Sequence, residues 1–349
     1  MIRENILDMV AYKPPLEDRR SGDMLLDFNE RTTGLPPWLL ESVCKHIRRN
    51  QLHIYPEYGR ILSFLAEYTG MEADQVMLTN GSDQGIDIIV RAVAMTGDEA
   101  IVPIPTFAML THSCEVSGLK LITPSYSFEN GYPFDQVRDS VSENTKIIVV
   151  CNPNSPTGTL LEPKLVAELA RMAPKATVLV DECYYEFSKK SVKDWVNELD
   201  NLFITRTFSK TWGLAALRLG YVISQQRNIE QLLKIRGPYD VNMLAVVAAQ
   251  EALKEPEFMH EYIKEVEEIA KPKLLNYLSD KGIRFWPTQA NFVLVYPPDG
   301  VELAAGLGKQ GIRTRPRGGP GIDGTVRITI GTEQDTHKLI AALDKVLQF

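Results

Sequence analysis

The amino-acid sequence predicts an α/β fold, with a large domain built on a mostly parallel sheet and a smaller α+β domain after it. The first observation is a set of five short apolar runs rich in β-branched residues, at 75–81, 99–106, 145–153, 176–182 and 201–210. Strands that are apolar throughout are typical of parallel strands buried on both faces. The second observation is that longer amphipathic stretches separate these runs, as in an α/β domain.

The stretch at 82–95 illustrates the helical pattern. Ile86, Ile89, Val90 and Val93 recur at i, i+3, i+4 and i+7, which places them on one face of a helix. We expect this helix to pack on the sheet.

The third observation is a change of character near residue 245. Long helical stretches come first, and two runs at 290–297 and 324–331 follow. In the second run Val326 and Ile328 alternate with Arg327 and Thr329, which predicts a sheet buried on one face only. We expect an N-terminal arm that joins the small domain at 1–35, a large domain at 36–243 and a small domain at 244–349.

Composition limits the kinds of partner. The 349 residues carry a net charge of −7, which argues against nucleic acid. No apolar run approaches the roughly 18 residues of a membrane span, and residues 1–15 interleave charges with apolar residues, unlike a signal peptide. The histidines lack metal-site spacing, so no metal is expected. Four scattered cysteines indicate reduced thiols in a cytoplasmic protein.

Polar side chains follow the predicted strands where each one ends. Asn80, Thr106, Asn154, Asp181 and Lys210 occupy these positions. In open α/β sheets, ligands bind in the crevice beyond the carboxyl ends of the strands. Their coincidence on five strands predicts one site at that edge of the sheet.

Two of the strand ends carry loops that suit a ligand. At 79–90 a turn at Gly81 leads into a helix that Ser82 or Asp83 can cap, and the free backbone N–H groups can hold a phosphate. An ordinary capped turn explains the same residues. The loop at 151–158, rich in amides and hydroxyls around Asn154, is either a rigid turn or a binding loop.

Asp181 ends the run at 176–182, and Tyr184 follows three positions later. The carboxylate can cap a helix or pair with a cation. It can also keep a pyridine nitrogen protonated, which makes the ring an electron sink. Tyr184 could then reach the phenolic oxygen of such a ring.

The stretch at 207–221 carries a lysine and an arginine in apolar surroundings. Lys210 can form a Schiff base with an aldehyde, and Arg218 can bind a phosphate, with Thr207 and Ser209 as hydroxyl donors. A strand that ends in a loop with two snorkelling side chains is the simpler alternative. The order of phosphate turn, amide loop, aspartate with tyrosine, and lysine with arginine predicts a site for pyridoxal phosphate.

These segments resemble the signatures of the fold-type I aminotransferases and, within them, the histidinol-phosphate aminotransferases. The similar segments are 152–158, 181–187, 209–221 and 326–332, with weaker likeness at 2–15 and 54–59. The resemblance covers nearly the whole chain. It implies a seven-stranded, mostly parallel sheet and a homodimer with shared active sites.

The resemblance implies a role for each matching residue. Lys210 would bond to the cofactor and move the proton between the substrate α-carbon and cofactor C4′. Asp181 would pair with the pyridinium nitrogen, and Tyr184 would contact the phenolic oxygen. The other implied cofactor contacts are Gly81, Ser82, Asp83, Thr207, Ser209 and Arg218 at the phosphate, Phe107 on the ring, Asn154, and Tyr55 from the other subunit. The implied substrate contacts are Arg327, which clamps a carboxylate, and Arg315, Tyr12 and Asn29. From the residues alone, Phe107 and Tyr55 also fit a core, and Arg327 a solvated strand face.

Three departures from the family pattern stand out. Ser155 precedes Pro-Thr-Gly where the family has asparagine, so either Asn154 or a hydroxyl serves the phenolic oxygen. Phe107 stands where tyrosine is frequent. Arg31 and Thr32 replace Asn-Pro in the N-terminal Asn-Glu-Asn-Pro, a change that bears on substrate recognition.

The expected function is a ping-pong transamination in which histidinol phosphate and 2-oxoglutarate give imidazole acetol phosphate and glutamate. Three alternatives stay open. They are a lyase like the O-phosphothreonine decarboxylases, an aminotransferase for aromatic or other amino acids, and a non-catalytic regulator that binds pyridoxal phosphate.

Overall fold

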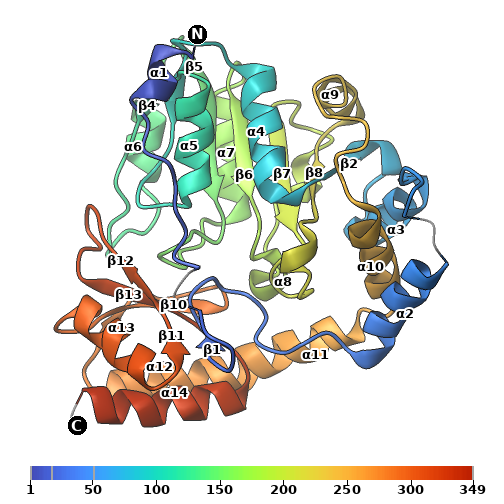
Figure 1. Cartoon of the computed structure of the whole chain (residues 1–349). Coiled ribbons are helices and arrows are strands. Elements are labelled where there is room, and N and C mark those ends of the chain that lie inside the picture. The colour runs from blue at the N-terminus through green and yellow to red at the C-terminus, as the bar shows by residue number, and fades with distance from the viewer. Residues whose placement is uncertain (1, 17–18, 50–51, 348–349) are drawn as a thin grey trace.

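The structure, a computed structural model, describes residues 2–16, 19–49 and 52–347 (Figure 1). Its main sheet has seven strands in the order β2-β8-β7-β6-β5-β3-β4. The strands are β2 (Val76–Thr79), β3 (Glu99–Ile101), β4 (Lys120–Ile122), β5 (Thr145–Cys151), β6 (Thr177–Asp181), β7 (Leu202–Thr207) and β8 (Gly220–Ile223). All are parallel except β8, which runs antiparallel to β2 and β7. The α/β fold with a mostly parallel seven-stranded sheet is therefore confirmed.

Both faces of this sheet are buried, which explains why its strands are apolar throughout. On one face, Met77 and Val149 pack with Ile86 and Ile89 of α4 (Gly81–Val93) and with apolar residues of α5 (Ala108–Val116) and α9 (Gln226–Leu232). On the other face, alternate strand residues pack with α7 (Pro163–Met172). The α4 periodicity predicted from the sequence is thus the face that covers the sheet.

The remaining helices before residue 243 are short or lie beside the sheet. They are α1 (Glu4–Leu7), α2 (Pro37–Arg48), α3 (Gly59–Thr69), α6 (Phe134–Asp139) and α8 (Tyr185–Ser188), with single 3-10 turns at Ala73–Gln75, Lys193–Trp195 and Ala215–Leu217. Helix α10 (Met243–Lys254) packs against α2 and α3. No helix among the described residues is long and apolar enough to cross a membrane.

The chain after α10 forms a second layer below the main sheet (Figure 1). A long helical stretch consists of α11 (Glu257–Glu265), a π-helical turn (Val266–Ala270) and α12 (Lys271–Asp280). An antiparallel sheet follows in the order β12-β13-β10-β9, with helices α13 (Gly300–Lys309) and α14 (Glu333–Val346). Its strands are β9 (Arg284–Phe285), β10 (Phe292–Tyr296), β12 (Arg315–Arg317) and β13 (Thr325–Thr329).

Strand β13 corrects one expectation. Its alternation predicts one buried face, but all five of its residues are buried. The polar face is covered by the N-terminal segment, because Asn29 N–H donates to the Thr329 hydroxyl (3.0 Å) and Arg327 donates to the Asp27 carbonyl (2.7 Å). The polar side chains of a buried strand face need hydrogen-bond partners within the protein. An alternating sequence pattern alone does not show whether those partners are protein groups or water.

The N-terminal segment thus lies between the two sheets. Its strand β1 (Met24–Leu25) pairs in parallel with β11 (Ile312–Arg313), and the Thr329 N–H donates to the Leu26 carbonyl at 2.9 Å. Strands β1 and β11 form a two-stranded sheet of their own, and the segment also hydrogen-bonds to β13. The division at 1–35, 36–243 and 244–349 stays a prediction.

Candidate active site

A cavity of about 560 Å³ opens at the carboxyl ends of the main strands. The fold brings the strand ends together there, since β6 ends at Asp181, β7 ends just before Lys210, and β2 leads into α4. Of the residues predicted from the sequence, those that line the cavity are Tyr12, Ser82, Asp83, Phe107, Asp181, Tyr184, Thr207, Ser209, Lys210 and Arg218. Its size suits a cofactor with part of a substrate.

Lys210 is partly buried and held by the N-terminal segment. Its Nζ donates a hydrogen bond to the Phe28 carbonyl oxygen at 2.8 Å. Burial lowers the pKa of the Lys210 ammonium, and the positive charge of Arg327 lowers it further. An amine shifted towards its neutral form can attack an aldehyde and accept a proton.

Asp181 is a buried carboxylate, 2% exposed. The Thr205 hydroxyl and the Cys183 thiol both donate to its Oδ1 at 2.9 Å. Burial raises the pKa of Asp181 to about 6, although these two hydrogen bonds act in the opposite direction. No cation among the described residues forms an ion pair with it, so its charge is available to a group in the cavity.

The neighbouring carboxylate, Glu182, has a different environment. It forms a fully buried ion pair with Arg206 at 2.8 Å and also accepts from the Ser191 hydroxyl. Its charge is therefore neutralised within the protein. Of the two adjacent acids, only Asp181 lines the cavity.

The start of α4 forms the opposite end of the cavity. Gly81 has φ +76°, a left-handed conformation that favours glycine, and a Cβ there would lie 2.5 Å from Nη2 at the end of the Arg218 side chain. The expected side-chain cap is absent from this described helix start, because Ser82 accepts from the Cys183 thiol and Asp83 pairs with Arg218 at 3.1 Å. The first N–H groups of the helix therefore remain available to an anion.

Two hydroxyls complete this end. Thr207 donates to Ser209 at 2.9 Å, and the Ser209 N–H donates back to Thr207 at 3.1 Å. Arg218 reaches the same end from a left-handed backbone conformation with φ +55°, which directs the guanidinium at Gly81. Helix N–H groups, hydroxyls and a guanidinium together suit a phosphate.

The loop at 151–158 places Ser155, not Asn154, in the cavity. Asn154 is fully buried, and its amide is bonded to the Pro105 carbonyl and to the hydroxyls of Thr157 and Thr106. Ser155 lines the cavity and accepts a hydrogen bond from Arg327 at 2.9 Å. The placement favours the hydroxyl of the two alternatives left open by the sequence.

The other predicted residues fall into two groups. Asn29 donates to the Tyr184 hydroxyl at 2.8 Å, so it orients the tyrosine and does not line the cavity. Tyr55 is 71% exposed, stacks on Tyr239 at 4.1 Å, and lies outside the cavity.

A recess of about 80 Å³ adjoins Lys210 and Tyr184, and three arginines line it. Arg315 and Arg327 are predicted substrate contacts. Arg317 was not predicted, because a short charged run reads as a polar loop. The signal that could have identified it is the spacing of Arg315 and Arg317, which share one face if the run is a strand.

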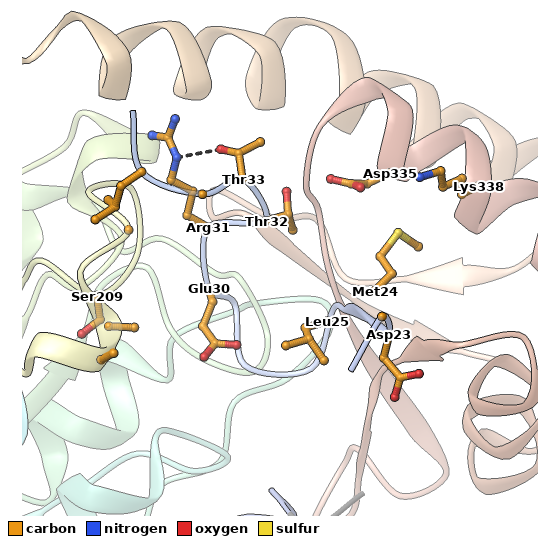
Figure 2. A pocket seen from close by; sticks show the side chains of 16 residues that line it. Asp23, Met24, Leu25, Glu30, Arg31, Thr32, Thr33, Ser209, Asp335 and Lys338 are labelled. Carbon is orange, nitrogen blue, oxygen red and sulfur yellow. Dashed lines mark hydrogen bonds between the residues drawn. The ribbon is translucent and has the colours of Figure 1, made fainter. Parts of the chain in front are cut away.

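Arg31 and Thr32 line a different cavity, of about 630 Å³, which shares Ser209 with the first (Figure 2). Arg31 donates to the carbonyls of Thr211 (3.0 Å) and Phe258 (3.2 Å), and its guanidinium lies 4.4 Å from the Tyr262 ring centroid. Neither Arg31 nor Thr32 lines the Lys210 cavity. Their position indicates an effect on the loop that carries Lys210 rather than on substrate contacts.

Comparison with known proteins identifies the family of the chain. A model of the family described as aminotransferase class I and II matches residues 22–343. The histidinol-phosphate aminotransferase of Geobacillus sp. strain WCH70 is 31% identical over 330 residues, covering 92% of this chain and 89% of that protein. The chain belongs to the class I and II aminotransferases.

Two solved structures share the fold. The structure of histidinol-phosphate aminotransferase from Sinorhizobium meliloti in complex with pyridoxal-5'-phosphate has a TM-score of 0.89 at 22% identity, over 99% of this chain and 97% of that chain. L-threonine-O-3-phosphate decarboxylase from Porphyromonas gingivalis has a TM-score of 0.81 at 22% identity, over 93% and 100%. At this identity the likeness concerns the fold, which therefore does not distinguish a transaminase from a lyase.

Pyridoxal phosphate is the cofactor of this family, and the cavity fits it. The α4 start with Arg218 suits the phosphate, unpaired Asp181 suits the ring nitrogen, and Lys210 suits the aldehyde. The protein is therefore a pyridoxal-phosphate-dependent aminotransferase.

Because Asp181 has no cationic partner among the described residues, we predict how the stability of the cofactor-free protein depends on pH. The folded-state pKa of Asp181, about 6, lies above its ordinary value of 3.8, so the folded state binds more protons between these pH values. Stability should therefore fall as pH rises through this window, by about 3 kcal/mol. The free energy of unfolding of the Asp181→Asn variant should not show this fall. Urea unfolding at a series of pH values from 4 to 7 measures it.

The control for this experiment is Asp139→Asn. Asp139 is an exposed carboxylate whose pKa is lowered by Arg138, so its replacement should not reproduce the effect. Identical pH dependence of wild type and Asp181→Asn would show that burial does not destabilise this carboxylate.

The position of Arg31 makes a second prediction. Arg31→Met keeps the methylenes but removes the donors to Thr211 and Phe258, so the loop after Lys210 loses its restraint. We expect kcat to fall roughly 10-fold, because the hydrogen bond to the Thr211 carbonyl is the one that restrains this loop, with the donor KM nearly unchanged. Steady-state kinetics measure both, and the exposed Arg60→Met is the control. A raised KM at unchanged kcat would instead place Arg31 in substrate recognition.

Proposed function

We propose that the protein transfers the amino group of histidinol phosphate to 2-oxoglutarate, giving imidazole acetol phosphate and glutamate. The observation that carries the proposal is the arginine-lined recess beside Lys210, which suits a phosphate. The names of relatives near 30% identity over almost the whole chain support it.

The recess suits one anionic group of each substrate in turn. Histidinol phosphate has a phosphate and no carboxylate, whereas 2-oxoglutarate has a carboxylate at each end. Arg315 and Arg327 both line the recess beside Lys210. Because both anions need the same guanidinium groups, the two substrates cannot occupy the recess together, which is compatible with ping-pong kinetics.

Each residue around the cofactor then has a proposed task. Bound pyridoxal phosphate supplies an electron sink that stabilises negative charge at the substrate α-carbon. Asp181 would hold the proton on the ring nitrogen, and Ser82, Arg218 and the α4 N–H groups would hold the phosphate. Tyr184, oriented by Asn29, would face the phenolic oxygen.

Lys210 would carry out the proton transfer. Its lowered pKa leaves a fraction of neutral amine that accepts the α-proton and returns it to the cofactor carbon. The Phe28 carbonyl holds the Nζ in place between transfers. Phe107 and Tyr12, which line the cavity, would limit the entry of water.

We also propose a homodimer in which Tyr55, exposed at 71%, reaches the phosphate end of the partner's cavity. A cytoplasmic location stays a prediction.

The test of the proposed function is product analysis with the cofactor-loaded protein. Histidinol phosphate and 2-oxoglutarate should yield glutamate, and the Lys210→Ala variant should yield none. Histidinol without its phosphate is the matched substrate control and should react much more slowly.

Other outcomes identify the alternatives. Carbon dioxide from O-phosphothreonine without glutamate formation would contradict the proposal and indicate a lyase. Glutamate formation from phenylalanine alone would indicate an aromatic aminotransferase. No turnover of any donor by protein that binds the cofactor would indicate a regulator.

A further inference from the structure

Three arginines project from one face of the small sheet. In the antiparallel pair β12–β13, Arg315 lies opposite Arg327 and Arg317 lies opposite Thr325. Side chains two apart on a strand share a face, so Arg315, Arg317 and Arg327 all point the same way. All three line the recess beside Lys210.

The three guanidinium groups lack the neutralising partners that nearby arginines have. Arg19 pairs with Asp27 at 2.7 Å, and Arg313 pairs with Asp23 at 2.5 Å. By contrast, no carboxylate among the described residues forms an ion pair with any of the three recess arginines. The positive charge of the recess is therefore uncompensated by the protein.

Their hydrogen bonding is also incomplete. Arg327 donates to the Ser155 hydroxyl and the Asp27 carbonyl, but its Nε has no partner. Arg317 Nε is likewise buried without a partner. The guanidinium carbon of Arg315 is 5.3 Å from the centroid of the Phe28 ring. Like charges directly opposite each other destabilise a sheet, so this arrangement suits a bound anion rather than the fold.

The number of charges indicates which anion. Two arginines suffice for a carboxylate, which carries one negative charge. A phosphate ester carries close to two at neutral pH. We propose that Arg317 is a specificity-determining residue whose third positive charge makes the recess select a phosphate ester over a carboxylate.

This inference rests on the proposed function, since it concerns the same substrate site, but it can be tested separately. The variant is Arg317→Met, which keeps most of the side-chain length and removes the charge. Arg317→Lys restores a charge without the planar fork. The control is Arg284→Met, because Arg284 belongs to β9 of the same sheet and its side chain is 55% exposed.

The first measurement is binding of inorganic phosphate to the cofactor-loaded enzyme by calorimetry, with the cofactor's own phosphate site already filled. Arg317→Met should weaken binding roughly 10- to 100-fold, the loss expected for one hydrogen bond to a charged group. Arg317→Lys should be intermediate, and Arg284→Met should bind like wild type.

The second measurement is the rate of each half-reaction. Arg317→Met should lower kcat/KM for histidinol phosphate by a similar factor and change that for glutamate by less than about threefold. An equal loss for both substrates, or unchanged phosphate binding, would overturn the inference. Weaker phosphate binding by the variant, in an enzyme whose wild type ignores histidinol phosphate, would support the inference and contradict the proposed function.

Discussion

The hydrogen bond from Lys210 Nζ to the Phe28 carbonyl joins the two sheets at the point where the reaction is proposed to occur. Lys210 lies in the loop just after β7 of the main sheet, and Phe28 lies in the segment along β13. The two residues beside Phe28 also form hydrogen bonds. The Asp27 carbonyl accepts one from Arg327 of the small sheet, and Asn29 donates one to the Tyr184 hydroxyl next to the main sheet. The segment therefore links the cofactor end to the substrate end of the cavity, in addition to the direct hydrogen bond from Arg327 to Ser155.

Asp181, Arg327 and Lys210 share a second property, because burial shifts the pKa of each towards the neutral form. Burial raises the pKa of Asp181 to about 6, and it lowers the pKa of Arg327 to about 10 and that of Lys210 below its usual range. The protein alone leaves these charges poorly compensated. A cofactor with a pyridinium nitrogen and substrates with anionic groups supply the missing charges, so binding should stabilise the fold while preparing the chemistry.

Much of this arrangement could be predicted from the sequence, because parallel strands buried on both faces have an unmistakable apolar pattern. Strands β4 and β8 escaped recognition because none of the three residues of β4 is buried and because β8 overlaps the lysine stretch at 207–221. The residues at strand ends could be predicted because the topology brings them to one edge. Whether Asn154 or Ser155 faces the cavity could not, because it depends on hydrogen bonds within the loop.

The remaining surprises involve charged side chains whose partners are far away in sequence. Arg31 contacts Thr211 and Phe258 carbonyls, which no local pattern reveals. Arg317 lies in a strand of three residues, too short for alternation to be distinguished from a polar loop.

The central claim is that Lys210 anchors pyridoxal phosphate covalently at the strand ends. The most direct measurement is borohydride reduction of the cofactor-loaded protein, followed by peptide mass spectrometry. The account predicts a phosphopyridoxyl group on Lys210 and none on other lysines. Label on a different lysine, or no label in protein that retains the cofactor, would contradict it.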